Sequence, residues 1–216
     1  MTYAFPLIII CGWLLLIIST SLLCKRFLPE EKELSRKIVH IGSGPILIVA
    51  YLYQLPYNLI FPLSCIITFT LFINHRLNLI RSLENIDRKS FGTTAYGLST
   101  SILIFFFWSN NASAVIAGIL MMALGDGFAG LIGRKVQSPS WKIFDQKKSL
   151  VGTLVMFITG FIVLLSINQL INTVYLSTLD IFTITSIAVV LEQLSFYGID
   201  NLTVPISVAL IWNWLL

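Results

Sequence analysis

Three acidic residues lie in or beside long apolar runs, where a charged side chain is costly. Asp126 stands inside one run, eight residues before Arg134, a spacing of about 12 Å along a helix axis. Glu192 lies in a later run and Asp200 just after it. Asp126 could pair with a basic residue to lock two helices, but a carboxylate in such a position is usually functional. Taken singly, Glu192 and Asp200 fit a structural role and a functional role equally well. Taken together with Asp126, they indicate a functional site.

Basic residues next to serines precede three of the apolar runs, in the strings Ser35-Arg36-Lys37, Lys89-Ser90 and Lys147-Lys148-Ser149. A serine can cap the helix that follows it, and the free N–H groups at a helix start attract anions. His40 lies four residues after Arg36, so the two share a helix face. For any one string, the alternative to an anion-binding role is an ordinary helix cap next to basic residues that only orient the chain in the membrane. Carboxylates that face such a surface favour Mg²⁺ with phosphate, because one or two carboxylates and substrate phosphates usually hold Mg²⁺.

The elements that must position these residues are membrane helices. The 216 residues are 56% hydrophobic and 11% charged, against about 25% charged in soluble domains, and the mean hydropathy is +0.88. This composition excludes a cytosolic enzyme, an extracellular module and a disordered chain. Because a span takes about 20 residues, we expect an all-α, polytopic membrane bundle of seven to eight helices. Residues 1–216 then form a single integral membrane domain.

We expect seven spans and a shorter apolar tail. They cover residues 4–23, 38–53, 57–73, 92–108, 112–133, 150–168 and 180–197, with the tail at 204–216. Trp212 and Trp214 in the tail fit interfacial anchors. No basic residue precedes the first run and Lys25-Arg26 follows it, which predicts a retained span with the N-terminus outside rather than a signal peptide.

The 14 Lys and Arg residues fall in alternate connections, at 25–37, 76–89 and 134–148, whereas the connections 54–57, 109–111 and 169–179 have none. The positive-inside rule makes the basic connections cytoplasmic. We expect the acidic residues among them, including Glu33, to be solvated. The net charge of +4 then reflects orientation and not nucleic-acid binding. The three cysteines are predicted to be small buried side chains, with no disulfide or metal role.

The glycines around Asp126 allow two interpretations. Gly125 to Gly130 matches the pattern GxGxxG, but a dinucleotide site needs a preceding strand and a βαβ unit, so a membrane helix excludes it. Glycine lets a ligand or a backbone approach closely. The spacing of Gly125, Ala129 and Gly133 also fits small-xxx-small helix packing.

Four strings taken together resemble the CTP-dependent polyprenol kinase family, which includes phytol, farnesol and dolichol kinases and CTP-using diacylglycerol kinases. They span about residues 35 to 205 and look most like the phytol kinase branch. The strings are Arg36-Lys37-Ile38-Val39-His40, Gly125-Asp126-Gly127-Phe128-Ala129 through Gly133-Arg134, Lys147-Lys148-Ser149-Leu150-Val151-Gly152-Thr153, and Glu192 with Asp200-Asn201-Leu202-Thr203-Val204-Pro205. Val151 departs from the family, in which a Glu is common at this position.

The resemblance implies phosphorylation of a long-chain isoprenoid alcohol such as phytol, farnesol or geranylgeraniol. CTP would be the donor and Mg²⁺ the cofactor, at the cytoplasmic face of a bacterial cytoplasmic or thylakoid membrane. Asp126 would hold Mg²⁺, with Asp200 or Glu192 as the second ligand or as the base for the hydroxyl. The residues expected to bind the nucleotide and its phosphates are Gly125, Gly127, Arg134, Lys147, Lys148 and Ser149, with Arg36, Lys37 and His40 bounding the site.

Other functions remain open at this point. The acceptor could be dolichol or diacylglycerol, and a lipid-phosphate cytidylyltransferase would use the same metal and nucleotide. An organic-anion transporter also suits membrane carboxylates and basic helix ends, although transporter sites usually lie near the bilayer midplane. Because the sequence contains neither a Walker A string nor the protein-kinase motifs, a soluble-type kinase is excluded.

Overall fold

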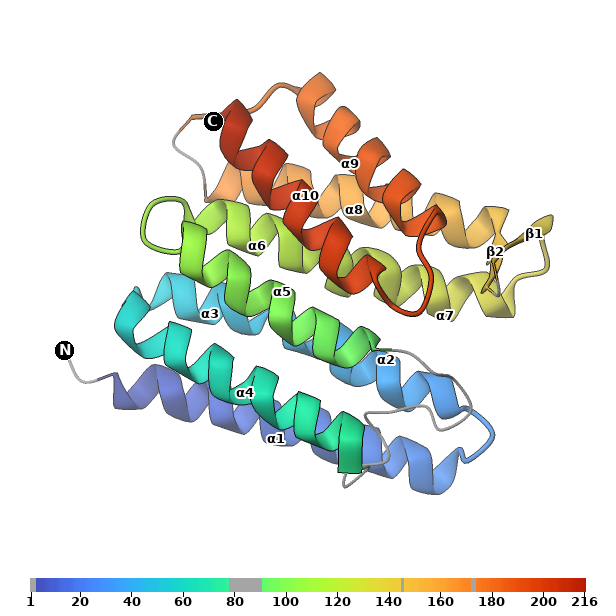
Figure 1. Cartoon of the computed structure of the whole chain (residues 1–216), viewed down its shortest axis with the longest axis horizontal. Coiled ribbons are helices and arrows are strands. Elements are labelled where there is room, and N and C mark those ends of the chain that lie inside the picture. Colours follow the sequence, from blue (N-terminus) through green and yellow to red (C-terminus); the bar gives the residue numbers. More distant parts are fainter. Residues whose placement is uncertain (1–2, 78–90, 145, 172–173) are drawn as a thin grey trace.

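The structure, a computed structural model, describes residues 3–77, 91–144, 146–171 and 174–216, and most of them are helical (Figure 1). The helices are α1 (Ala4–Phe27), α2 (Lys32–Ser43), α3 (Ile46–Leu52), α4 (Tyr57–Leu77), α5 (Gly92–Phe107), α6 (Ala112–Leu120), the π-helical turn η1 (Met121–Asp126), α7 (Gly127–Lys135), α8 (Leu150–Leu170), α9 (Thr178–Gln193) and α10 (Asp200–Leu215). Strands β1 (Ser140–Ile143) and β2 (Gln146–Ser149) pair antiparallel. The all-α prediction is therefore confirmed except for this hairpin, which the sequence analysis did not predict.

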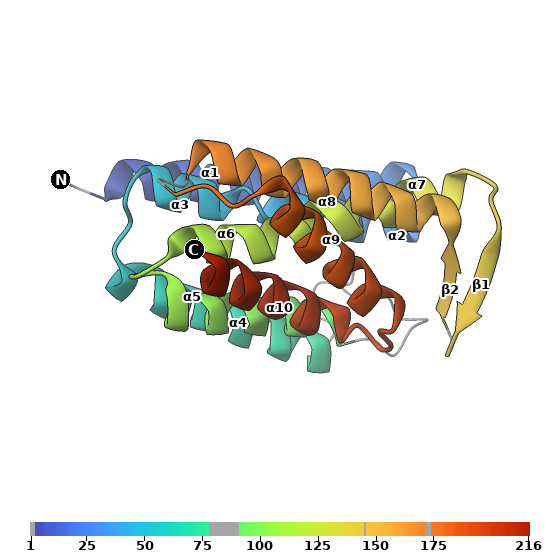
Figure 2. The ribbon, with the colours of Figure 1, turned by 90° about the horizontal axis from the view of Figure 1, so that it is seen from above.

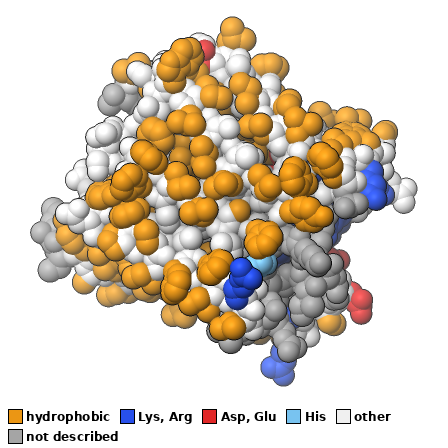
Figure 3. Space-filling view, in the orientation of Figure 1, with side chains coloured by type: hydrophobic (Ala, Val, Ile, Leu, Met, Phe, Trp, Pro, Cys, Tyr) orange, Lys and Arg blue, Asp and Glu red, His pale blue; other side chains and the backbone are white. Residues whose placement is uncertain are grey.

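Four helices in the described residues are long and apolar enough to cross a membrane. They are α1, α4, α8 and the continuous helix Ala112–Lys135 that α6, η1 and α7 form, and α5 is a shorter apolar helix. Hydrophobic side chains are spread over the whole face in Figure 3, while most visible charged side chains lie at its right and lower side. This distribution is the one expected of a membrane protein with its polar chemistry at one end.

The helices form two layers with α6 and α9 between them (Figure 2). One layer contains α1, α2, α3, α7 and α8, and the other contains α4, α5 and α10. All the residues of α6 except Ala112 are buried, and α6 packs against α5, α8 and α10. The core of the bundle is therefore built around the segment that leads directly into Asp126.

The basic connections meet at one end of the bundle. In Figure 1 the C-terminal ends of α1, α4 and α7 lie at the same end as the starts of α2, α5 and α8 and the hairpin. The connections between α3 and α4 and between α5 and α6 lie at the opposite end, as do both chain termini (Figure 1). The predicted grouping of the connections 25–37 and 134–148 is confirmed, and most of 76–89 lies outside the described residues.

Several predictions about the segments are wrong in detail. The second predicted span is two helices, because α2 begins at Lys32 and ends before Gly44-Pro45, where proline supplies no N–H. Ser35 consequently lies inside α2 and does not cap it. The apolar tail is longer than predicted, since α10 begins at Asp200.

Some side chains also differ from expectation. Trp212 is fully buried and donates a hydrogen bond of 3.1 Å to the Ser113 hydroxyl, so it is no interfacial anchor, whereas Trp214 is exposed. All three cysteines are free as predicted, but Cys11 and Cys65 are exposed and not buried. On apolar helices of this kind, residues on the outer face are expected to contact lipid. A small apolar side chain such as cysteine can therefore lie there without being buried in the core.

Candidate active site

The three acidic residues singled out by the sequence come together in space. Asp126 ends η1, Glu192 lies in the last turn of α9, and Asp200 begins α10. One carboxylate oxygen from each lies within 4.8 Å of the others. Glu192 and Asp200 are buried and Asp126 is partly buried. Three hard oxygen donors from three elements are a set that suits a divalent cation such as Mg²⁺.

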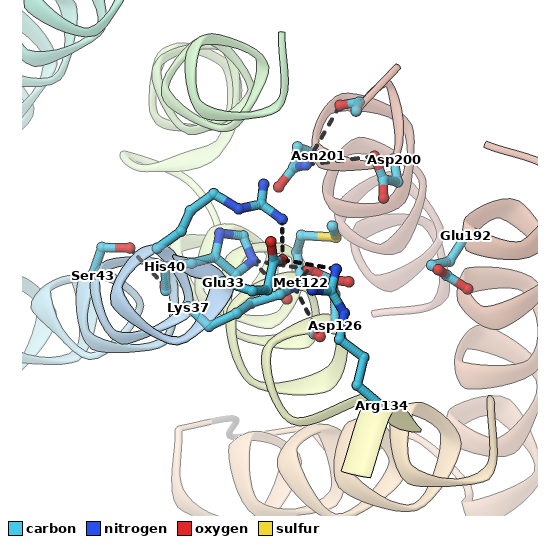
Figure 4. A network of polar contacts seen from close by, with 12 residues as sticks. Glu33, Lys37, His40, Ser43, Met122, Asp126, Arg134, Glu192, Asp200 and Asn201 are labelled. Carbon is cyan, nitrogen blue, oxygen red and sulfur yellow. Dashed lines mark hydrogen bonds and ion pairs between the residues drawn. The ribbon is translucent and has the colours of Figure 1, made fainter. Parts of the chain in front are cut away.

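Asp126 is held by α2. Lys37 Nζ donates to Asp126 Oδ2 at 2.5 Å and to the Asp126 carbonyl oxygen at 3.1 Å. His40 Nε2 lies 3.4 Å from the same Oδ2 and 3.2 Å from the Met122 carbonyl oxygen (Figure 4). Lys37 is buried, and Gly130 leaves room for its stem, because a Cβ there would lie 2.7 Å from Lys37 Cε. A π-helical turn at this point is typical of functional sites.

The hairpin supplies a second lysine. Successive residues of a strand point to opposite faces, so Lys148 is buried while Lys147 is exposed. Lys148 Nζ forms an ion pair with Glu192 Oε1 and donates to the Glu192 carbonyl oxygen at 3.0 Å. Gln193 also donates to Glu192 Oε2 at 2.8 Å. Glu192 is thereby fixed from both the hairpin and its own helix.

Asp200 differs from the other two carboxylates. Its backbone N–H donates to Ser195 Oγ at 2.7 Å, and Asn201 Nδ2 donates to its Oδ1 at 3.4 Å. Within the described residues no lysine, arginine or histidine forms an ion pair with Asp200, although the side chain is buried. A buried carboxylate costs free energy unless a cation compensates it. Lys148 and Lys37 act on Asp200 without an ion pair and Asp126 repels it, so the Asp200 carboxylate is the one of the three that a bound cation would compensate most.

Arg36 and Arg134 extend the site toward the basic end. Glu33 forms an ion pair with Arg36 and lies 3.4 Å from Arg134 Nη2 (Figure 4). Burial acts to raise the pKa of the Glu33 carboxyl, but Arg36, and then Arg134 and Lys37, outweigh it and hold the pKa below its usual value. The prediction of a solvated Glu33 is thus wrong: α2 starts early enough to turn Glu33 inward.

The start of α8 faces the same space. Ser149 accepts a hydrogen bond from the Gly152 N–H at 3.2 Å, so the predicted cap is confirmed. Gly133 of α7 approaches Gly152 so closely that a Cβ on Gly133 would lie 2.8 Å from the Gly152 Cα. The predicted small-residue packing therefore brings the free N–H end of α8 beside Arg134. The predicted cap at Ser90 lies outside the described residues.

These groups line one cavity of about 1110 Å³ at the basic end of the bundle. Ligand pockets commonly have volumes of about 300–1,000 Å³, so the space suffices for a nucleoside triphosphate together with the head of a lipid. Of the residues predicted from the sequence, the cavity is lined by Arg36, Lys37, His40, Asp126, Arg134, Lys147, Lys148, Ser149, Glu192 and Asp200.

Gly125 and Gly127 do not line this cavity. A Cβ on Gly127 would lie 2.3 Å from Ile41 Cγ1, and one on Gly125 would lie 3.5 Å from Met156 Cγ. In the structure these two glycines pack against α8 and α2, and their predicted place among the nucleotide-binding residues stays a prediction. Successive residues of a helix point about 100° apart, so Gly125 and Gly127 flank the direction of the carboxylate between them.

Other lining residues were missed by the sequence analysis. They include Tyr96 of α5, Gln193 of α9, Phe144 at the hairpin tip and Phe196 after α9. The Phe144 and Phe196 ring centroids lie 5.2 Å apart, and the Gln193 Oε1 atom is buried without a hydrogen-bond partner. Aromatic residues are ordinary in apolar runs, so nothing in the spacing marks Tyr96, Phe144 or Phe196. The polar Gln193 beside Glu192 is the one of the four that offered a signal.

Comparison with known proteins gives a consistent picture. The chain is 34% identical over 205 residues to phytol kinase of Synechocystis sp., a match that covers 90% of this chain and 84% of that protein. It is 29% identical over 217 residues to chloroplastic phytol kinase 1 of Arabidopsis thaliana, covering 90% of this chain and 70% of that one. With dolichol kinase of Saccharomyces cerevisiae it is 32% identical over 113 residues, 51% of this chain and 20% of that one. No family model and no solved structure matches the chain.

Proposed function

Because the chain belongs to the polyprenol kinase family, which includes phytol and dolichol kinases, we propose that it phosphorylates a long-chain isoprenoid alcohol. The acceptor is an alcohol such as phytol, farnesol or geranylgeraniol, and the donor is CTP. The terminal phosphoryl group passes to the alcohol oxygen, and the nucleoside diphosphate leaves. Phosphoryl transfer depends mainly on positioning and on charge neutralisation, and the site offers the groups for both.

The convergence of Asp126, Glu192 and Asp200 within 4.8 Å carries this proposal. A purely structural membrane protein has no need of three carboxylates from three helices at one point. The buried Asp200 carboxylate forms no ion pair with a lysine, arginine or histidine in the described residues, which supports a metal ion at this point. Asp126 and Asp200 would hold Mg²⁺, which would neutralise phosphate charge when bound.

The remaining polar groups have separate tasks in this proposal. Arg134 and Lys147 bind the phosphates from the basic end, with the N–H groups at the start of α8. Lys37 and Lys148 hold Asp126 and Glu192 in position. Glu192 is the third carboxylate of the cluster, and we assign to it the proton of the acceptor hydroxyl.

Arg36 and His40 complete the α2 side of the site. Arg36 Nε is buried and has no hydrogen-bond partner among the residues that the structure describes, while its Nη2 holds Glu33. A phosphate oxygen would satisfy this N–H group, because anions accept strongly from guanidinium donors. His40 contacts Asp126 and bounds the cavity toward α5.

The membrane arrangement is part of the proposal. Seven to eight helices cross the bilayer, with the N-terminus outside and the basic end of the bundle at the cytoplasmic face of a bacterial cytoplasmic or thylakoid membrane. The meeting of the basic connections at one end supports this orientation. The nucleotide then reaches the cavity from water while the alcohol stays in the bilayer.

The test is a product analysis with the purified full chain in detergent. We expect CTP and Mg²⁺ to convert phytol, farnesol or geranylgeraniol into the monophosphate with release of CDP. Dolichol, diacylglycerol, ATP and UTP are the comparison arms. A CDP-lipid with pyrophosphate identifies a cytidylyltransferase instead, and no product with any acceptor and nucleotide contradicts the proposal.

A further inference from the structure

The helices around the carboxylates form a ring with one open side. In order, α2 packs against α7, α7 against α8, α8 against α9, α9 against α10, and α10 against α5. The ring would close if α5 packed against α2, but in the described residues these two helices do not pack against each other along their length. Helix α2 instead packs on α1, and α5 packs on α4. The ring is therefore interrupted between these two helix groups.

The cavity reaches this interruption. Val39 and His40 of α2 line it, and so do Thr93 and Tyr96 of α5. The Tyr96 and His40 ring centroids lie 4.7 Å apart, and the Ser43 hydroxyl donates to the Tyr96 hydroxyl at 3.4 Å. Side chains and not backbone packing thus bridge α2 and α5. Such a bridge can part without moving a helix.

The bridge adjoins the reactive groups. His40 contacts Tyr96 with one face and places Nε2 3.4 Å from Asp126 Oδ2. A molecule that passes Tyr96 therefore arrives beside the carboxylates. In Figure 4 His40 and Ser43 lie on the side of the site opposite Glu192, which places this approach across the cavity from the α9 carboxylate.

We propose that the hydrocarbon chain of the acceptor enters the cavity from the bilayer between α2 and α5, and that Tyr96 positions its first isoprene unit. The inference rests on the proposed function for the identity of the acceptor. The acceptor is an apolar chain with one hydroxyl group. Its hydrocarbon chain has to stay in lipid while its hydroxyl group reaches the carboxylates. The unpacked α2–α5 side joins these two places, and the other sides of the ring are closed by packed helices.

A photo-crosslinking experiment tests the route without needing catalysis. The probe is a farnesol analogue with a diazirine in its first isoprene unit, next to the hydroxyl-bearing carbon, added to the full-length protein in nanodiscs. After irradiation, peptide mass spectrometry should find the label on α2 and α5, near Val39 and Tyr96, and excess phytol should displace it. Label on the outer faces of α8 and α9, or label that phytol does not displace, overturns the inference.

Matched variants sharpen the result. Val39→Trp narrows the passage and should lower the crosslinking about tenfold, whereas Leu98→Trp, at an exposed position of α5, should leave it unchanged. In the transfer assay Tyr96→Ala should raise the KM for farnesol much more than it lowers kcat, because it removes a positioning contact. Equal crosslinking in Val39→Trp and wild type contradicts the route.

The two proposals fail separately. If wild type transfers phosphate but the label lies elsewhere, the kinase proposal stands and the route is wrong. If the label lies between α2 and α5 without any transfer, the passage binds an isoprenoid alcohol and the kinase proposal is wrong.

Discussion

The two ends of the bundle are built by different means. At the far end neutral hydrogen bonds join the helices: Trp212 donates to Ser113, Asn111 to Asn213, and Trp108 to the Leu55 carbonyl oxygen. At the basic end two ion pairs with buried lysines join the elements. Lys37 pairs with Asp126, and Lys148 pairs with Glu192. Buried charges are a poor means of stabilisation. The difference indicates that the far end holds the bundle together and the basic end carries out chemistry.

The largest expected effect is at Asp126. Asp126→Asn keeps the size of the side chain but removes the charge that Lys37 and a metal ion would share, so phosphoryl transfer to phytol should fall about 10³-fold. The thermal unfolding midpoint in detergent should change far less. The Asp180→Asn variant, at the far end, where Asp180 and Ser177 form the capping box of α9, is the matched control and should keep full activity. Near-normal transfer in Asp126→Asn would remove Asp126 from the metal site.

Substitutions of the two neighbouring lysines of the hairpin should separate an effect on stability from an effect on nucleotide binding. Lys148→Met leaves Glu192 buried without its partner, so it should lower the free energy of unfolding by about 3 kcal/mol. Lys147→Met removes an exposed charge and should lower it by less than about 1 kcal/mol. Lys147→Met should instead raise the KM for CTP, most strongly at low salt. Equal stability losses in the two variants would contradict the burial difference between these lysines.

At the far end we expect stability to change without activity. Trp212→Phe removes the indole N–H that Ser113 accepts and leaves a small void in a fully buried position. It should lower the free energy of unfolding by about 1–2 kcal/mol, measured by thermal or denaturant unfolding in detergent. The kcat/KM of the folded fraction for phytol should match wild type. A selective loss of kcat/KM would mean that the two ends are coupled.

The smallest expected effect is a gain in the free energy of unfolding. Asp200→Asn removes a buried charge that Asp126 repels and that forms no ion pair in the described residues, so without Mg²⁺ the variant should be about 1 kcal/mol more stable than wild type. Adding Mg²⁺ should raise the unfolding midpoint of wild type but not of Asp200→Asn, because a ligand stabilises only the state that binds it. Equal Mg²⁺ stabilisation of both proteins would exclude Asp200 as a metal ligand.

The residues that gather at the cavity could be predicted from the sequence better than the helix boundaries. Asp126, Glu192 and Asp200 were identifiable because charge is rare and costly in apolar runs, and Ser149 because its place before a run marks a cap. Hydrophobic runs do not show where a helix breaks, so the α2–α3 division at Gly44-Pro45 was missed. The hairpin was missed because each strand has only 4 residues and the second strand contains no apolar residue.

Other details depend on tertiary contacts that no local pattern reports. Glu33 is buried because Arg36 and Arg134 meet it from two helices, and Tyr96 bounds the cavity because α5 lies beside α2 at that point. Gly127 packs on Ile41, although the same glycine beside an aspartate also fits a phosphate site. In each case the residue type allowed two roles, and the neighbouring helix decided between them.

The most direct test of a metal-dependent kinase site is transfer of label from γ-labelled CTP to phytol by the purified full-length chain, with and without Mg²⁺. We expect labelled phytyl phosphate with Mg²⁺ and little or none after the divalent cations are chelated. Undiminished transfer without divalent cations would contradict the metal site. Absence of labelled lipid with Mg²⁺, for phytol and every other isoprenoid alcohol tried, would contradict the kinase function itself.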